Sequence, residues 1–140
     1  MAKFEQFQQT QQEKLHTMET RQHKLHQHWQ EEQVRLQTLS DHLQKLEHNH
    51  QMDSSLGLQN LSQVKQQFTD MCQQQQHKLT EAEQQWQRQR LACLEQAKYN
   101  KGLDHLIEKR MQRSSEKVRR QEARQTDEMT LQAFLRRQGS

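Results

Sequence analysis

Apolar residues recur along this sequence at alternating steps of three and four, and no proline interrupts them. In the first half the repeat contains Leu15, Met18, Leu25, Trp29, Leu36, Leu39, Leu43 and Leu46, and the same frame extends back to Phe4. In the second half it contains Leu61, Phe68, Cys72, Leu79, Ala82, Trp86, Cys93, Leu103 and Ile107. This spacing is typical of a coiled coil, in which each helix buries one narrow face. The pattern therefore predicts an all-α fold.

Several positions of the same frame carry polar residues. They are Gln8, Gln11, Gln22 and Glu32 in the first half, and Lys65, Gln75, Gln89, Gln96 and Asn100 in the second. With 29% hydrophobic and 28% charged residues, the chain has too few apolar side chains for a thick globular core. Disorder and a parallel oligomeric coiled coil are the alternatives to an intramolecular pair of helices.

One segment has the composition of a turn. MDSSLG at residues 52 to 57 contains Asp and Ser, which favour turns and helix N-caps, and a glycine. We expect an antiparallel two-helix coiled-coil hairpin within a single domain, residues 1–140. The first helix is predicted over about 3–51, the turn over about 52–57 and the second helix over about 58–137.

Folding the chain about Ser55 and Leu56 makes the numbers of facing residues add to 111. This register predicts packing layers, which are Phe4 with Ile107, Met18 with Cys93, Leu25 with Trp86, Trp29 with Ala82, Leu39 with Cys72, and Leu43 with Phe68. It also predicts two polar layers, Gln11 with Asn100 and Gln22 with Gln89, because polar groups in a seam need polar partners. Three layers fit poorly: Glu32 with Leu79, Leu36 with Gln75, and Leu46 with Lys65.

In this register Met1 lies opposite Arg110, so residues 111–140 have no helix of the same chain to pair with. Charge changes near the same place. Residues 1–108 hold 12 basic and 14 acidic side chains, whereas residues 109–140 hold 9 and 4. An overhanging helix of this kind is predicted to bind a partner, and the alternative is a frayed, solvated end. Asn100 and Gly102 are expected to soften the helix where the overhang begins.

Other classes of function find little support. No glycine-rich phosphate loop, activated nucleophile or concave pocket is predicted, so we expect no enzyme, and neither a cofactor nor a metal. Seven of nine histidines lie between His16 and His50, but they do not form a closed set of four ligands. The basic end follows a hairpin and contains acidic residues, unlike a basic zipper, so nucleic acid is not expected. No apolar run is long enough to insert into a membrane.

The carboxyl-terminal half resembles the FliJ family, which consists of small coiled-coil proteins of flagellar and related type III export machines. The resemblance rests on Trp86, on KGLDHLIEKR at residues 101–110, and on Glu116, Arg120, Glu122 and the pair Asp127 and Glu128. It implies a non-catalytic stalk that binds a ring of the export ATPase and the cytoplasmic part of the export gate, and that also escorts export chaperones. It further implies a cytoplasmic location at the membrane-associated export apparatus.

Taken with the overhang, the resemblance predicts a set of partner-binding residues. They are Arg110, Arg113, Lys117, Arg119, Arg120, Arg124, Asp127, Glu128, Phe134 and Leu135. The arginines and the lysine are expected to meet an acidic or carbonyl-lined surface, and Phe134 and Leu135 an apolar collar. The alternative function is a coiled-coil adaptor or export chaperone that binds secreted clients without an ATPase.

Overall fold

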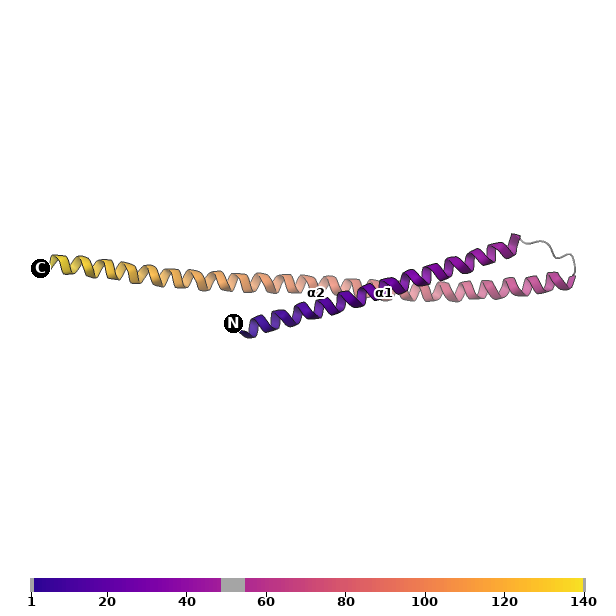
Figure 1. Ribbon diagram of the computed structural model, residues 1–140, viewed down its shortest axis with the longest axis horizontal. Coiled ribbons are helices and arrows are strands. Elements are labelled where there is room, and N and C mark those ends of the chain that lie inside the picture. The colour runs from indigo at the N-terminus through magenta and orange to yellow at the C-terminus, as the bar shows by residue number, and fades with distance from the viewer. Residues whose placement is uncertain (1, 49–54, 140) are drawn as a thin grey trace. The chain divides into compact units, whose positions relative to one another are not determined.

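The computed structural model describes residues 2–48 and 55–139, which form two long helices, α1 (Ala2–His48) and α2 (Ser55–Gln138) (Figure 1). No strand occurs within these two ranges, so the all-α class is confirmed. Of the predicted turn, residues 52–54 lie outside the described residues. Ser55, Leu56 and Gly57 belong to the first turn of α2.

The described residues fall into two compact units. The hairpin unit is residues 13–48 together with 55–97, and the terminal unit is residues 2–12 together with 98–139. Within each unit a part of α1 packs antiparallel against a part of α2, which confirms a pair of packed helices.

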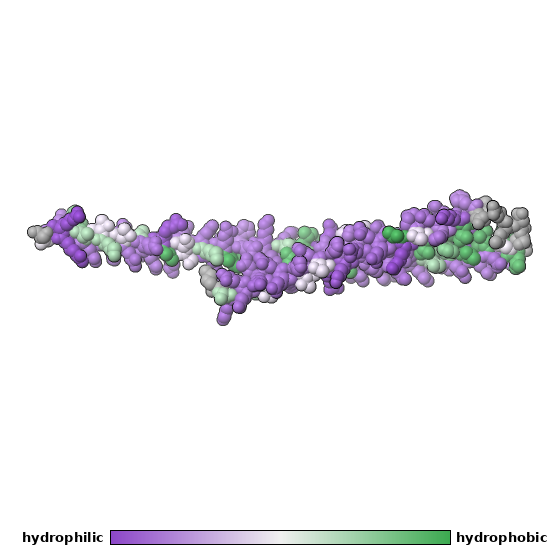
Figure 2. Space-filling view, in the orientation of Figure 1, coloured by the Kyte–Doolittle hydropathy of each residue, from purple (hydrophilic) through white to green (hydrophobic). Residues whose placement is uncertain are grey.

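In the hairpin unit the partly or fully buried residues follow the predicted heptad frame. They include Leu15, Met18, Leu25, Trp29, Leu36, Leu39, Leu43 and Leu46 of α1 and Leu61, Phe68, Cys72, Leu79, Ala82, Trp86 and Cys93 of α2. Ala82 and Cys93 are the most buried apolar side chains, at 2% and 6% exposed. Two helices bury only one face each, so most of the remaining surface stays hydrophilic (Figure 2).

A buried polar layer lies in the middle of the hairpin unit. Glu32 is 3% exposed, and the Gln75 side-chain amide donates to both its backbone carbonyl, at 3.1 Å, and its carboxylate. Arg35 Nη1 lies 2.8 Å from Glu32 Oε1. Glu32 and Gln75 had been assigned to two separate, poorly fitting layers, opposite Leu79 and Leu36. The long amide of Gln75 reaches across one helical turn and joins them, because a buried carboxylate needs hydrogen-bond donors.

Aromatic rings form a second cluster in the hairpin unit. The indoles of Trp29 and Trp86 stack with centroids 5.1 Å apart and an angle of 14° between their planes, and the His26 ring lies 4.7 Å from Trp86. The register had set Trp86 opposite Leu25 and Trp29 opposite Ala82. The large rings instead meet across one turn, as offset-stacked aromatic pairs favour.

The predicted pair of Gln22 with Gln89 takes a different form. The side-chain amide of Gln89 donates to the backbone carbonyl of Met18 at 3.2 Å. The polar side chain thus finds an acceptor on the facing helix, although that acceptor belongs to the neighbouring turn.

The terminal unit shows the same antiparallel packing. The Asn100 side chain donates to the backbone carbonyl of Gln11 at 3.0 Å, and Gln8 Nε2 donates to Asp104 Oδ1 at 2.5 Å. The first of these contacts is the predicted layer of Gln11 with Asn100. Further along α2, the Arg110 guanidinium carbon lies 4.6 Å from the centre of the Phe4 ring. This cation–π contact joins α2 to α1 near the start of α1.

Candidate partner-binding surface

Beyond Arg110, α2 continues as a helix to Gln138, and every side chain of residues 111–138 is exposed. The helix is built from residues of good helix propensity, with no proline, and Thr126 and Thr130 donate to the carbonyls of Glu122 and Thr126. The last 28 residues of this 84-residue helix, about eight turns, are therefore exposed to solvent.

Five basic residues in this region recur in steps of three and four along one face of α2. They are Arg110, Arg113, Lys117, Arg120 and Arg124, which we call the basic stripe. At about 100° of rotation per residue they lie within a sector of about 80° of the helix surface, and they extend over about 21 Å of its axis. Arg110, Lys117 and Arg124 stand at intervals of seven after Leu103, in the same row of the seam. Cations thus replace apolar residues where the α1–α2 packing ends.

Helical rotation also places the other five predicted site residues, of which four lie on the side of the basic stripe and one does not. Asp127, Glu128, Phe134 and Leu135 fall within a sector of about 120° that also contains the basic stripe. Leu131 lies in that sector too; it is not among the ten predicted residues, although its heptad position marks it. Arg119 lies on the opposite side of the helix. A partner that touches one face of α2 would therefore contact nine of the ten predicted residues.

The cations of the basic stripe form no ion pair within residues 2–48 and 55–139. None of its five side chains lies within ion-pair distance of a carboxylate in the part of the chain that the structure describes. Neighbouring cations of the stripe stand about 4.5–6 Å apart along the axis, which is less than the Debye length of about 8 Å at physiological salt. The stripe therefore presents a concentrated positive field along one face.

Apolar side chains follow the stripe along the helix. Leu131, Phe134 and Leu135 are each between 56% and 57% exposed although they are large and apolar. They lie within two turns of one another, after the acidic pair Asp127 and Glu128. The surface thus has a fixed order of cations, anions and then apolar groups.

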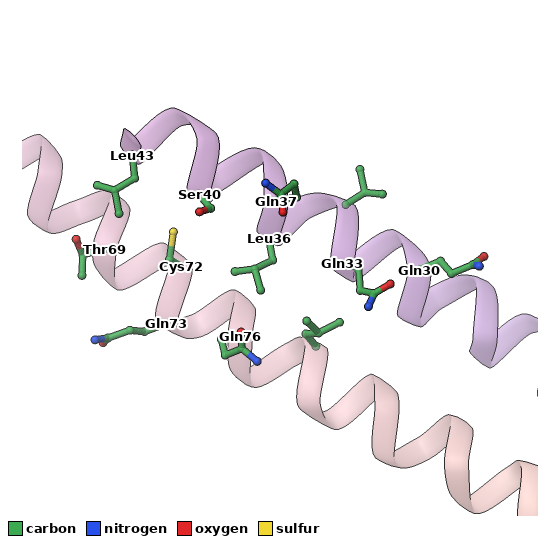
Figure 3. Close-up of a pocket in the computed structure, with 12 residues that line it drawn as sticks. Gln30, Gln33, Leu36, Gln37, Ser40, Leu43, Thr69, Cys72, Gln73 and Gln76 are labelled. Atoms are coloured by element: carbon green, nitrogen blue, oxygen red, sulfur yellow. The ribbon is translucent and has the colours of Figure 1, made fainter. Parts of the chain in front are cut away.

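The hairpin unit has a separate groove between α1 and α2, which sequence reasoning missed (Figure 3). It has a volume of about 1100 Å³, and Leu36 and Leu43 of α1 and Cys72 and Leu79 of α2 line it. Its other lining residues are Gln30, Gln33, Val34, Gln37, Ser40, Thr69, Gln73 and Gln76, so no charged side chain lines it. The density of glutamine on both helices was the sequence signal that could have indicated an uncharged surface.

Exposed apolar side chains also gather at the start of α2, in the hairpin unit. Leu56, Leu58, Val64 and Met71 are exposed there, and Figure 2 shows this part of α2 as the largest apolar area of the view. Some of this area belongs to the helix face that packs against α1.

The reactive and metal-binding groups form no shared centre among the described residues. No three His, Cys, Asp or Glu side chains come close enough to hold a metal ion within residues 2–48 and 55–139. Cys72 and Cys93 are both free, and burial, followed by the negative charge of Glu19, raises the pKa of the Cys93 thiol despite a hydrogen bond with Gln89. No helix in the described ranges is long and apolar enough to cross a membrane.

Comparison with known protein families matches the model described as flagellar FliJ protein to residues 1–139 of the 140-residue chain. Searches of curated proteins and of solved structures return no match.

Proposed function

The chain belongs to the FliJ family of flagellar proteins, and we propose that it is a non-catalytic stalk of a flagellar or type III protein export apparatus. In this role it binds the ring of the export ATPase and couples it to the cytoplasmic part of the export gate, and it also escorts export chaperones. It acts in the cytoplasm, peripherally at the membrane-associated apparatus.

One observation carries the proposal, namely the continuation of α2 beyond its contacts with α1. An exposed helix whose basic stripe forms no ion pair among the described residues, and which ends in apolar side chains, has the properties of a surface that binds a partner. We assign the ATPase contact to Arg110, Arg113, Lys117, Arg120 and Arg124, together with Asp127, Glu128, Phe134 and Leu135. Arg119 points away from this face, so the proposed contact leaves it out.

The proposal is tested by mixing the full-length protein with the purified export ATPase of the same organism. We expect the protein to promote assembly of the ATPase ring, measured by mass photometry, and to raise its rate of ATP hydrolysis. Because exposed charge pairs each contribute only about 0–1 kcal/mol, binding depends on several basic residues together and weakens as salt is raised. Absence of both assembly and stimulation would contradict the stalk role.

The groove of the hairpin unit favours a second candidate function, that of a coiled-coil adaptor or chaperone. An apolar floor of Leu36, Leu43 and Leu79 with an uncharged rim suits an amphipathic helix of a secreted client. This function needs no ATPase. Client binding that is lost in Leu43→Asp, together with no response of the ATPase, would favour the adaptor over the stalk.

A further inference from the structure

The basic stripe continues the helix face along which α2 packs against α1. Within the terminal unit the row Leu103, Arg110, Lys117, Arg124 and Leu131 keeps the seven-residue interval of the coiled-coil seam. The first part of this row already packs against α1, because Leu103 is partly buried and Arg110 packs on the Phe4 ring. Its second half is exposed, although it has the geometry that knobs-into-holes packing requires.

We propose that residues 110–135 of α2 bind an acidic α-helix of the partner, which continues the two-stranded coiled coil where α1 ends its contacts. The inference rests on the proposed function, because the partner that carries this helix is the export ATPase. The partner helix carries Asp or Glu in steps of three and four opposite the basic stripe. It then carries a cation opposite Asp127 and Glu128, and apolar residues opposite Leu131, Phe134 and Leu135.

Charge selects this occupant over a second copy of the chain. If two copies paired through this face in parallel register, each cation of the stripe would meet itself. If they paired antiparallel with facing numbers adding to 237, Arg113 would meet Arg124 and Lys117 would meet Arg120. Both arrangements set like charges together, which destabilises a pair of helices.

The order of side chains selects a helix over a phosphate surface. Nucleic acid or an anionic lipid headgroup would satisfy the five cations, but Asp127 and Glu128 lie on the same face and repel phosphates. The apolar group after them keeps heptad spacing at Leu131 and Leu135. A helix can match cations, anions and apolar groups in one row, because its own side chains repeat at the same interval.

Two variants of the full-length chain separate the faces of α2. Lys117→Glu reverses a charge in the stripe, and Arg119→Glu makes the same change two residues away on the opposite side. We expect Lys117→Glu to weaken binding of the purified export ATPase about tenfold, and Arg119→Glu to weaken it less than about twofold. If both variants weaken binding equally, the ATPase responds to the net charge of the helix and not to one of its faces. This result would overturn the inference and leave the proposed function standing.

A photo-crosslinking experiment identifies the bound element. Benzoylphenylalanine replaces Gln121, which is exposed on the stripe face, or Thr126, which is exposed on the opposite side and serves as the control. The result expected is a crosslink from position 121 to a helix of the ATPase with carboxylates in steps of three and four. A crosslink to a loop or to a segment without carboxylates overturns the inference.

A synthetic probe decides the inference if the ATPase does not bind, an outcome that would contradict the proposed function. The probe is an acidic helical peptide of about four heptads, with Glu at the positions facing the stripe and Leu at those facing Leu131 and Leu135. The wild-type chain is expected to bind it, Lys117→Glu to lose that binding, and Arg119→Glu to keep it. Absence of binding by the peptide, or stripe-dependent binding to phosphatidylserine vesicles in its place, overturns the inference.

Discussion

Glu32 is the most buried charged residue among those that the structure describes. Its carboxylate is buried, and the Gln75 amide and the Arg35 guanidinium donate to it. Replacing Glu32 or Gln75 with Ala leaves the other polar group buried without that partner. We expect each single change to lower the free energy of unfolding by about 1–3 kcal/mol, and Glu32→Ala with Gln75→Ala to cost less than the sum. Urea unfolding measures the cycle, exposed Glu31→Ala is the control, and strict additivity would contradict a direct interaction.

Cys93 is the residue with a shifted ionisation. Its pKa is raised by burial and by Glu19, so at pH 8 a smaller fraction is thiolate than for an ordinary thiol with a pKa of 9.0. We expect iodoacetamide to alkylate Cys93 more slowly than Cys72, and Glu19→Gln to speed the reaction at Cys93. Peptide mass spectrometry resolves the two sites. An unchanged rate in Glu19→Gln would mean that this charge has no influence on the thiol.

The raised pKa of Cys93 also makes the free energy of unfolding depend on pH. In the pH range between the unfolded pKa of about 9 and the higher folded pKa, the folded chain binds more protons than the unfolded chain. The stability that this thiol contributes is therefore fully present below about pH 9 and is lost as the pH rises through the folded value. Cys93→Ala removes this part of the pH dependence.

At the residue scale, the sequence was sufficient for the heptad frame but not for individual contacts. Apolar spacing alone identified Leu25, Trp29 and Trp86 as seam residues, because burial depends on which face a residue occupies. It could not predict that Trp29 stacks on Trp86, or that Gln75 reaches Glu32. Such contacts depend on the rotamers of long side chains, which can span a helical turn.

At the scale of the helices, a substitution at Gly102 tests whether glycine lowers the stability of α2 just before the basic stripe. It lies within α2 without a positive φ, and an added Cβ would have no atom within 4 Å. Gly102→Ala is expected to raise the free energy of unfolding by about 1 kcal/mol, since it adds helix propensity without a clash. Thermal melting by circular dichroism measures this. A lower melting temperature would show that the position requires glycine.

The antiparallel pairing of the two helices is tested by a disulfide. In a Cys72→Ala background, Met18→Cys is expected to oxidise with Cys93 within one chain, because both positions lie on the seam and Gln89 bonds the Met18 carbonyl. Thr17→Cys, which is exposed, is the matched control and is expected to react less. Efficient crosslinking between chains, with none within a chain, would contradict the intramolecular hairpin and favour a parallel oligomer.

At the scale of the whole molecule, the sequence was sufficient to predict the overhang. The register specifies which residues of the second helix face a residue of the first, and the residues beyond Arg110 have none. Charge counts also located the basic end. Two features of the surface were not predicted. The division of the ten site residues by face follows from helical rotation, which separates Arg119 from the rest. The uncharged groove between Leu36 and Cys72 depends on how far the two helices stand apart there, and heptad spacing does not specify that distance.

The central claim is that residues beyond Arg110 bind the export ATPase and do not hold the two helices together. It is tested most directly by a chain that ends at Arg110, compared with the full-length chain by titration against the purified ATPase. Circular dichroism melting of both chains is the control for folding. We predict a nearly unchanged thermal transition, because the removed side chains at 111–139 are all exposed, together with loss of ATPase binding. A truncated chain that folds and binds with full affinity, or one that no longer folds, would contradict the account.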